Sequence, residues 1–273
     1  MIASTIIKRQ ASSFASHSVK TNKAYLSYLT MGFTIPFLVS YYSTYSGAQD
    51  ELKGRSNPRC KSSSNFDMTG SSDSITWDQI KHYIESGELY KLVRTPEVTA
   101  KYRQHKFDVE SQGSTLVSYI LQHRLRWDAD QLQQLNSVTL ASDSQKIAAL
   151  FKDKSSLKIL PNDFPYNFEP CVSHILVWSK IYIPLYKSNI DATTDDAVAI
   201  DSVNPKVKRL IESFLDGLLK PLGLTNYVWF INYPRLQSIK SVSHIHVLIN
   251  SYDKNPIQRL LTDESLLITL PAQ

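Results

Sequence analysis

The sequence predicts an α+β fold in which several helices precede an antiparallel β-sheet. Between residues 74 and 152, apolar side chains recur at the three- and four-residue spacing of amphipathic helices. After residue 156 the pattern changes to short runs rich in β-branched and aromatic residues, which is typical of strands. The later segments follow the order strand, strand, helix, strand, strand. This order predicts an antiparallel sheet with one helix between two strand pairs.

The helical part is expected to begin just after Thr76. Thr76 and Gln79 have the spacing of a capping box, and Gly87 marks the end of the helix that they start. Pro96 marks the next break in the chain. The helical segments that we expect cover residues 77–86, 97–106, 114–126 and 128–152.

The sheet is expected to contain two strand pairs that are separated by a helix. Asn204 and Pro205 are residue types favoured at the N-cap and at the first position of a helix, and Gly223 lies beyond its end. A polar loop over residues 191–201 precedes this helix. The strands that we expect cover residues 157–160, 174–183, 227–232 and 241–249.

The N-terminal region differs in composition from the rest of the chain. Residues 1–23 are basic, rich in Ser and Ala and free of acidic residues, as is typical of a mitochondrial transit peptide. Residues 24–42 are uncharged and long enough to cross a bilayer as one helix, which indicates membrane anchoring; a cleaved leader and a buried helix are the alternatives. Residues 43–73 have the composition of a flexible linker. We expect a mitochondrial location, possible membrane association included, with a cytoplasmic location as the alternative.

Residues 74–273 are expected to form a single domain. It divides into a helical part (74–156), a sheet (157–250) and a C-terminal tail (251–273).

Charge and cysteine content exclude two classes of protein. The net charge is +5, and the four basic residues before Asp50 account for +4 of it. The folded part is therefore close to neutral, which argues against a nucleic-acid-binding surface. The two cysteines are too few for a disulfide scaffold.

Two histidines in the last expected strand are the main candidates for a functional site. His244 and His246 are two residues apart, so both side chains lie on one face of a strand. Paired imidazoles can attack a phosphate, transfer protons or bind metal; partly buried histidines with satisfied hydrogen bonds are the structural alternative. His174 would supply a third ligand for zinc, but no acidic residue at a diagnostic spacing supports a metal site. We therefore expect no resident cofactor, with zinc as the alternative.

Other polar residues have both a functional and a structural interpretation. Asn232 lies twelve residues before His244 and either contacts a ribose or phosphate or starts a turn. Lys180 either neutralises phosphate or is simply solvated. The loop that begins at Asn162 either forms one wall of a nucleotide pocket or closes one end of the sheet. The histidines expected on helix surfaces are His82, His105 and His123.

Two segments resemble the histidine-triad (HIT-like) superfamily, over about residues 157–250. The first is ILPNDFPYNFEPCVSHILVWSK at residues 159–180, and the second is NYVWFINYPRLQSIKSVSHIHVLI at residues 226–249. The resemblance implies nucleotidyl chemistry, in which the central histidine of a triad attacks an α-phosphate and serine holds phosphate oxygens.

Alignment on Ser241 and Val242 places His244 at the first triad position, His246 at the nucleophile and Leu248 at the third position. Leucine cannot donate a hydrogen bond. A shift of the frame by two residues places Val242 first instead, and that frame also lacks one histidine. The triad is degenerate in both frames, which weakens the case for hydrolase or transferase activity.

The chain from Thr76 onward also resembles the fungal N-acetylglucosamine-induced protein family. The matching segments are TWDQI at 76–80, LYKLVRTP at 89–96, YILQHRLRW at 119–127, LPNDFPY at 160–166, HILVWSK at 174–180 and SVSHIHVLI at 241–249. This resemblance covers more of the chain than the first one and implies little about mechanism.

Together these patterns predict that the protein binds a nucleotide or another phosphorylated small molecule. The alternatives are a non-catalytic interaction protein of the mitochondrion and a metal-dependent hydrolase that uses His174, His244 and His246. A homodimer is left open. The catalytic candidates are His246 and His244, and the candidates for phosphate or nucleotide binding are His174, Asn232, Ser241, Lys180 and Asn162.

Overall fold

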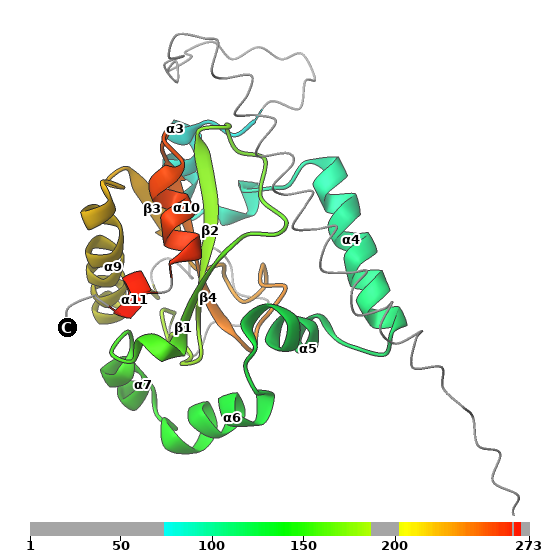
Figure 1. The fold of residues 1–273 in the computed structure, drawn as a ribbon, viewed down its shortest axis with the longest axis vertical. Coiled ribbons are helices and arrows are strands. Elements are labelled where there is room, and N and C mark those ends of the chain that lie inside the picture. Colours follow the sequence, from blue (N-terminus) through cyan, green and yellow to red (C-terminus); the bar gives the residue numbers. More distant parts are fainter. Residues whose placement is uncertain (1–73, 187–201, 264, 269–273) are drawn as a thin grey trace, which may run out of the picture. The chain divides into compact units, whose positions relative to one another are not determined.

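The computed structural model describes residues 74–186, 202–263 and 265–268 (Figure 1). All of these residues belong to one compact unit. The predicted transit peptide, the possible transmembrane helix, the linker and the polar loop at 191–201 lie outside the described residues. Within the described part of the chain, no helix is both long and apolar enough to cross a membrane.

The centre of the domain is a four-stranded sheet in the order β1-β2-β4-β3, and all neighbouring strands are antiparallel. The predicted α+β class and the helix between two strand pairs are therefore confirmed. The strands are β1 (Leu157–Pro161), β2 (Val172–Ser179), β3 (Tyr227–Phe230) and β4 (Ser243–Asn250).

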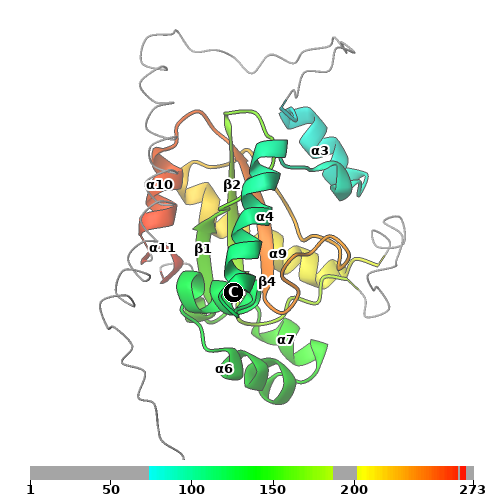
Figure 2. The ribbon, with the colours of Figure 1, turned by 90° about the vertical axis from the view of Figure 1, so that its right-hand side faces the viewer.

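One face of the sheet forms the main apolar core together with α9 (Pro205–Leu219). The register pairs Ile175 with Val247 and Val177 with Ile245, and all four side chains are buried on this face. The predicted N-cap of α9, Asn204, accepts hydrogen bonds from two backbone amides of the first turn. Figures 1 and 2 show α9 on the side of the strands opposite to α4 (Pro96–Ser111).

The opposite face of the sheet carries the histidines. On this face β2 and β4 are paired at His174 with Leu248, Leu176 with His246, and Trp178 with His244. Two apolar clusters cover its ends. One contains Leu248 and residues of α3 (Trp77–Glu85) and η1 (Leu89–Lys91), and the other contains Leu176, Trp178 and residues of η2 (Ile120–Leu125) and α6 (Ala129–Gln134).

The helices before the sheet follow the predicted order, with different bounds. The capping box at Thr76 is present, whereas the segment expected at 114–126 is α5 (Leu116–Tyr119) followed by the π-helix η2. Arg126 ends η2 in the left-handed conformation, with φ of 58°. The segment expected at 128–152 contains α6, the π-helix η3 (Leu135–Thr139) and α7 (Asp143–Ala149).

Short helices complete the fold. Ile257 and Leu260 of α10 are buried in the main core, so the C-terminal tail is an integral part of the domain. The short helices are η4 (Lys154–Ser156), η5 (Lys220–Leu222), α10 (Asn255–Thr262) and α11 (Ser265–Ile268).

Candidate functional site

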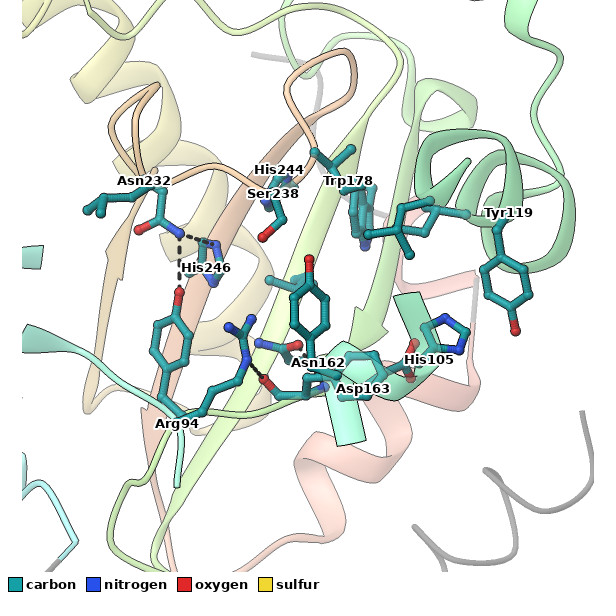
Figure 3. A pocket seen from close by; sticks show the side chains of 18 residues that line it. Arg94, His105, Tyr119, Asn162, Asp163, Trp178, Asn232, Ser238, His244 and His246 are labelled. Atoms are coloured by element: carbon teal, nitrogen blue, oxygen red, sulfur yellow. Dashed lines mark hydrogen bonds between the residues drawn. The ribbon is translucent and has the colours of Figure 1, made fainter. Parts of the chain in front are cut away.

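A pocket lies on the histidine face of the sheet, and its cavity volume is about 120 Å³ (Figure 3). Its floor consists of side chains from β2 and β4, including Trp178, His244 and His246. The walls come from four places: Arg94 with the middle of α4, α5 with the first residue of η2, the loop at 162–166, and the loop at 232–239. Segments far apart in the sequence therefore meet around the predicted histidines.

His246 and His174 form a buried pair. Nε2 of His174 lies 2.9 Å from Nδ1 of His246, and both side chains are buried. Nε2 of His246 lies 3.2 Å from Nδ2 of Asn232, and Nδ2 of Asn162 lies 3.2 Å from both ring nitrogens of His174. Both ring nitrogens of His246 therefore have partners, which are His174 on Nδ1 and Asn232 on Nε2.

Both members of this pair are neutral at physiological pH. Burial, reinforced by Arg94 and by His244, lowers the pKa of His174 to about 3. Burial also lowers the pKa of His246 well below its usual value, with the other two histidines and Arg94 acting in the same direction. When the Asn232 amide donates to Nε2 of His246, the proton of this neutral ring lies on Nδ1 and is donated to His174.

His244 has a different environment, although it is only two residues away. Its side chain is partly exposed, and its Nδ1 donates a hydrogen bond of 3.0 Å to the carbonyl oxygen of Val242. Burial lowers the pKa of His244, and the Val242 carbonyl partly opposes this shift. A proton fixed on Nδ1 leaves the lone pair of the neutral ring on Nε2. In the described part of the chain, no hydrogen-bond partner is found for this nitrogen, and the ring lines the pocket.

Arg94 places a positive charge in the pocket. Its Nε donates a hydrogen bond of 2.9 Å to the carbonyl oxygen of Phe164. Its guanidinium carbon lies 4.8 Å from the ring centre of Tyr102 and 5.2 Å from that of Tyr166. Figure 3 shows the two terminal nitrogens of Arg94 directed away from that carbonyl, toward the interior of the pocket. The two tyrosines and the carbonyl hold the guanidinium in place, which leaves these nitrogens to meet an anion.

Tyr166 connects Arg94 to the buried histidine pair. Nδ2 of Asn232, which contacts His246, also donates a hydrogen bond of 3.2 Å to the Tyr166 hydroxyl. The position of the Arg94 guanidinium therefore depends on the buried histidine pair, because Asn232 links His246 to Tyr166 and Tyr166 contacts Arg94.

Two further polar groups occupy the other end of the pocket. Nε1 of Trp178 is buried and has no hydrogen-bond partner, although the ring lines the pocket. Asp163, also a lining residue, forms an ion pair with Arg124, with 2.6 Å between Oδ1 and Nη2. The charge of Asp163 is therefore compensated, whereas a buried indole N–H without a partner is a donor that a ligand acceptor would satisfy after a small movement.

Five of the seven predicted site residues meet at this place, and two do not. His244, His246, Asn162 and Asn232 line the pocket, and His174 lies behind His246. Ser241 is exposed in the loop before β4, and neither it nor Lys180 lines the pocket.

Lys180 instead lies over the Trp127 ring, 5.6 Å from its centre. Ser243, two residues after Ser241, accepts a hydrogen bond from the backbone of Ile183. The Lys180 ammonium group and the Ser243 hydroxyl therefore both make local contacts at this end of the sheet.

The prediction for His105 was wrong. His105 lines the pocket, with its ring centre 4.8 Å from that of Tyr119 and 5.5 Å from that of Phe164. His82 and His123 are exposed, as expected. A signal for His105 was present, because Val98, Tyr102, His105 and Val109 follow the spacing of one helix face.

Arg94 was also missed. Its segment, LYKLVRTP, was part of the family resemblance, and Arg94 is an isolated cation between Val93 and the N-cap Thr95. No local pattern showed that Phe164, seventy residues later, would orient it.

The three histidines do not form a metal centre. Among the described residues, no three His, Cys, Asp or Glu side chains are grouped so that they could hold a metal ion. Nε2 of His174 and Nδ1 of His246 face each other instead of a common point.

Comparisons with known proteins find a family model and two fungal relatives that are similar to this chain. Residues 76–250 match the family model described as protein of unknown function (DUF3605). An uncharacterized protein of Saccharomyces cerevisiae is 36% identical over 176 residues, which cover 63% of this chain and 77% of that protein. N-acetylglucosamine-induced protein 1 of Candida albicans is 29% identical over 199 residues, which cover 71% of this chain and 75% of that protein. The crystal structure of HTC1 matches with a TM-score of 0.50 and 34% identity, covering 68% of this chain and 95% of that one.

Proposed function

Because this chain belongs to the DUF3605 family, whose function is unknown, we propose a function from the geometry of the pocket: it binds a small phosphorylated molecule, with nucleotides among the candidates. The phosphate lies between the Arg94 guanidinium and Nε2 of His244. The observation that carries this proposal is the hydrogen bond from His244 to Val242, because it leaves the remaining ring nitrogen available in a pocket that also holds a fixed cation.

Anion binding follows from the charge and the geometry of Arg94. A guanidinium is planar and always charged, and it can bind two phosphate oxygens at once. The two tyrosine rings hold it before the ligand arrives, so little side-chain freedom is lost on binding.

The hydrogen bonds favour His244 over His246 as the reacting residue. His246 would have to break its contact with Asn232 or with His174 before it could attack, and its burial leaves little access. His244 already has the required tautomer. This corresponds to the triad frame with Val242 first, His244 in the centre and His246 third. Leu248, which the other frame requires as its third member, is fully buried in the apolar core.

The reaction that this arrangement supports is phosphoryl or nucleotidyl transfer through His244. Nε2 attacks phosphorus, a nitrogen–phosphorus bond forms, and the bond to the leaving oxygen breaks with its electron pair on that oxygen. Water then attacks phosphorus, the nitrogen–phosphorus electrons return to Nε2, and the proton that the water loses balances, through the solvent, the proton taken up by the released oxygen. Binding without turnover is the simpler form of the same proposal.

Thermal unfolding in the presence of nucleotides and of inorganic phosphate tests the binding step. We expect stabilisation of the intact chain, and we expect Arg94→Gln to abolish it. Arg103→Gln is the matched control, because Arg103 is exposed on α4 and does not line the pocket. Absence of stabilisation by every phosphorylated compound would favour the non-catalytic interaction protein.

Incubation with a nucleotide labelled at its α-phosphate tests the chemical step. A label that is released by acid, resists base and is absent from His244→Asn would identify a phosphoramidate on that residue. A label retained by His244→Asn and lost from His246→Asn, with both variants folded, would reverse the assignment of the two histidines.

The location of the protein is a separate proposal, which rests on the composition of residues 1–23. We propose import into the mitochondrion or attachment to its membrane. A fluorescent protein fused to residues 1–50 would report mitochondria if this is right and the cytosol if it is wrong.

A further inference from the structure

We propose that the pocket selects singly charged phosphate groups, and therefore that its ligand is a phosphodiester or another monoanionic phosphate rather than a phosphate monoester. This inference rests on the proposed function and names the substrate class of the same site. It follows from the number of uncompensated charges that surround the cavity.

The lining contains one cation without a carboxylate partner. Among the described lining residues, Arg94 and Asp163 are the two whose side chains are charged when the histidines are neutral. The Asp163 carboxylate binds Arg124 at 2.6 Å, so the charges of these two side chains cancel. Arg94 has aromatic and carbonyl contacts and no acidic partner among the residues that the structure describes, and it therefore supplies a net charge of +1.

The histidines add no positive charge to this sum. His244 and His105 line the pocket, and burial lowers the pKa of each, which favours the neutral rings. His174 and His246 share one hydrogen bond, which requires an unprotonated nitrogen on one of the rings, and Asn232 donates to the other nitrogen of His246. A second proton on either ring would place two donors against each other in a buried site. The buried position of both rings opposes protonation further.

A dianion would therefore leave one negative charge without compensation. Charges that are removed from water require a partner or a set of hydrogen bonds, and an unpaired charge strongly opposes burial. A phosphate monoester carries nearly two negative charges at neutral pH, because its second pKa is about 6. A phosphodiester carries one charge, which Arg94 alone can balance, and its ester oxygens need no cation.

Two compounds with the same aromatic group test this selection. Methyl 4-nitrophenyl phosphate is a monoanion, whereas 4-nitrophenyl phosphate is mainly a dianion at pH 7.5. We expect the intact chain to bind the diester at least about fivefold more tightly in titration calorimetry. Equal or tighter binding of the monoester would overturn the charge inference while leaving the phosphate site intact. If neither compound bound, the proposed function would fail, and this inference with it.

Substitutions in the Asp163–Arg124 ion pair should change the ratio of monoester affinity to diester affinity in opposite directions. Asp163→Asn leaves the charge of Arg124 uncompensated and should improve monoester binding relative to diester binding by about threefold or more. Arg124→Gln leaves Asp163 uncompensated and should disfavour the monoester further. General damage to the fold would weaken both ligands in both variants and would contradict the inference.

Glu85→Gln is the matched control for these substitutions. It removes one negative charge from an exposed position at the end of α3, away from the lining residues. The ratio of the two affinities should not change. A change as large as that of Asp163→Asn would show that overall charge, rather than the pocket, determines the preference.

Discussion

The two faces of the sheet are made from the same strands and have different organisation. The face against α9 is a continuous apolar core, in which Ile245, Val247 and Leu215 are fully buried. The other face has two separate apolar clusters, and the pocket with its histidines and Arg94 lies between them. The comparison shows that apolar packing stabilises the fold mainly from one side, so the other side can hold buried polar groups whose hydrogen bonds must be satisfied individually.

The largest effect should come from the α9 face. Leu215→Ala removes a fully buried side chain from the main core and should lower the free energy of unfolding by about 2–5 kcal/mol. Urea denaturation monitored by circular dichroism measures this change. The matched substitution on the pocket face, His244→Ala, should reduce stability by less, because His244 is partly exposed. A greater loss in His244→Ala would contradict the contrast between the two faces.

The next effect is a pH dependence of the free energy of unfolding, and it arises from the buried histidines on the pocket face. The pKa of His174 is about 3 in the folded protein and about 6.5 in the unfolded chain. The unfolded chain therefore takes up a proton first as the pH falls, and stability is complete above pH 6.5 and decreases below it. For His174 the loss between pH 7 and pH 5 is about 2 kcal/mol, and it levels off near pH 3. His246 acts in the same direction.

Denaturation curves at several pH values would measure this dependence. His174→Gln should lower stability at pH 7 and flatten its decline toward pH 5, because one titrating group has been removed. Gln133→Ala, which removes no titratable group and lies at an exposed site, should leave the pH profile unchanged. An unchanged profile in His174→Gln would show that His174 is not held neutral by its surroundings.

The smallest effect is expected at Trp178. Phe in its place keeps an aromatic ring, removes a buried N–H that has no partner, and loses part of the apolar contact of the indole. Since no hydrogen bond is lost and only part of the ring is removed, thermal unfolding of Trp178→Phe should correspond to a loss of about 1 kcal/mol. A loss of stability well above this value would mean that, in the protein in solution, the indole N–H donates a hydrogen bond to a group in the pocket wall.

The sequence predicted the sheet well, because strand periodicity and turn residues are local signals. The alternation of residues around His244 and His246 correctly placed both histidines on one face. The C-terminal helix α10 was not anticipated, although Pro256 stands in its first turn, since a two-turn amphipathic segment resembles a tail with a few apolar residues. The π-helices were also missed, because they depend on packing rather than on a sequence pattern.

The pocket was predicted only in part, for a physical reason. Asn162 and Asn232 were found because they flank strands that contain histidines. Arg94 depends on a carbonyl seventy residues away, so no nearby residue indicates its position. Ser241 and Lys180 lie close to strand ends, where the direction of a side chain depends on the loop and not on the alternation of the strand.

The buried group beneath the pocket has a consequence for how this family can diverge. His174, His246, Asn162 and Asn232 come from four segments, and each has a hydrogen-bond partner within this buried group. Substitution of any one of these residues leaves a donor or acceptor on another without a partner. Selection therefore acts against single substitutions, but not against simultaneous replacement by apolar residues. Homologous sequences should therefore keep these four positions together or lose them together, and lineages of the second kind would retain the fold after the pocket has changed its use.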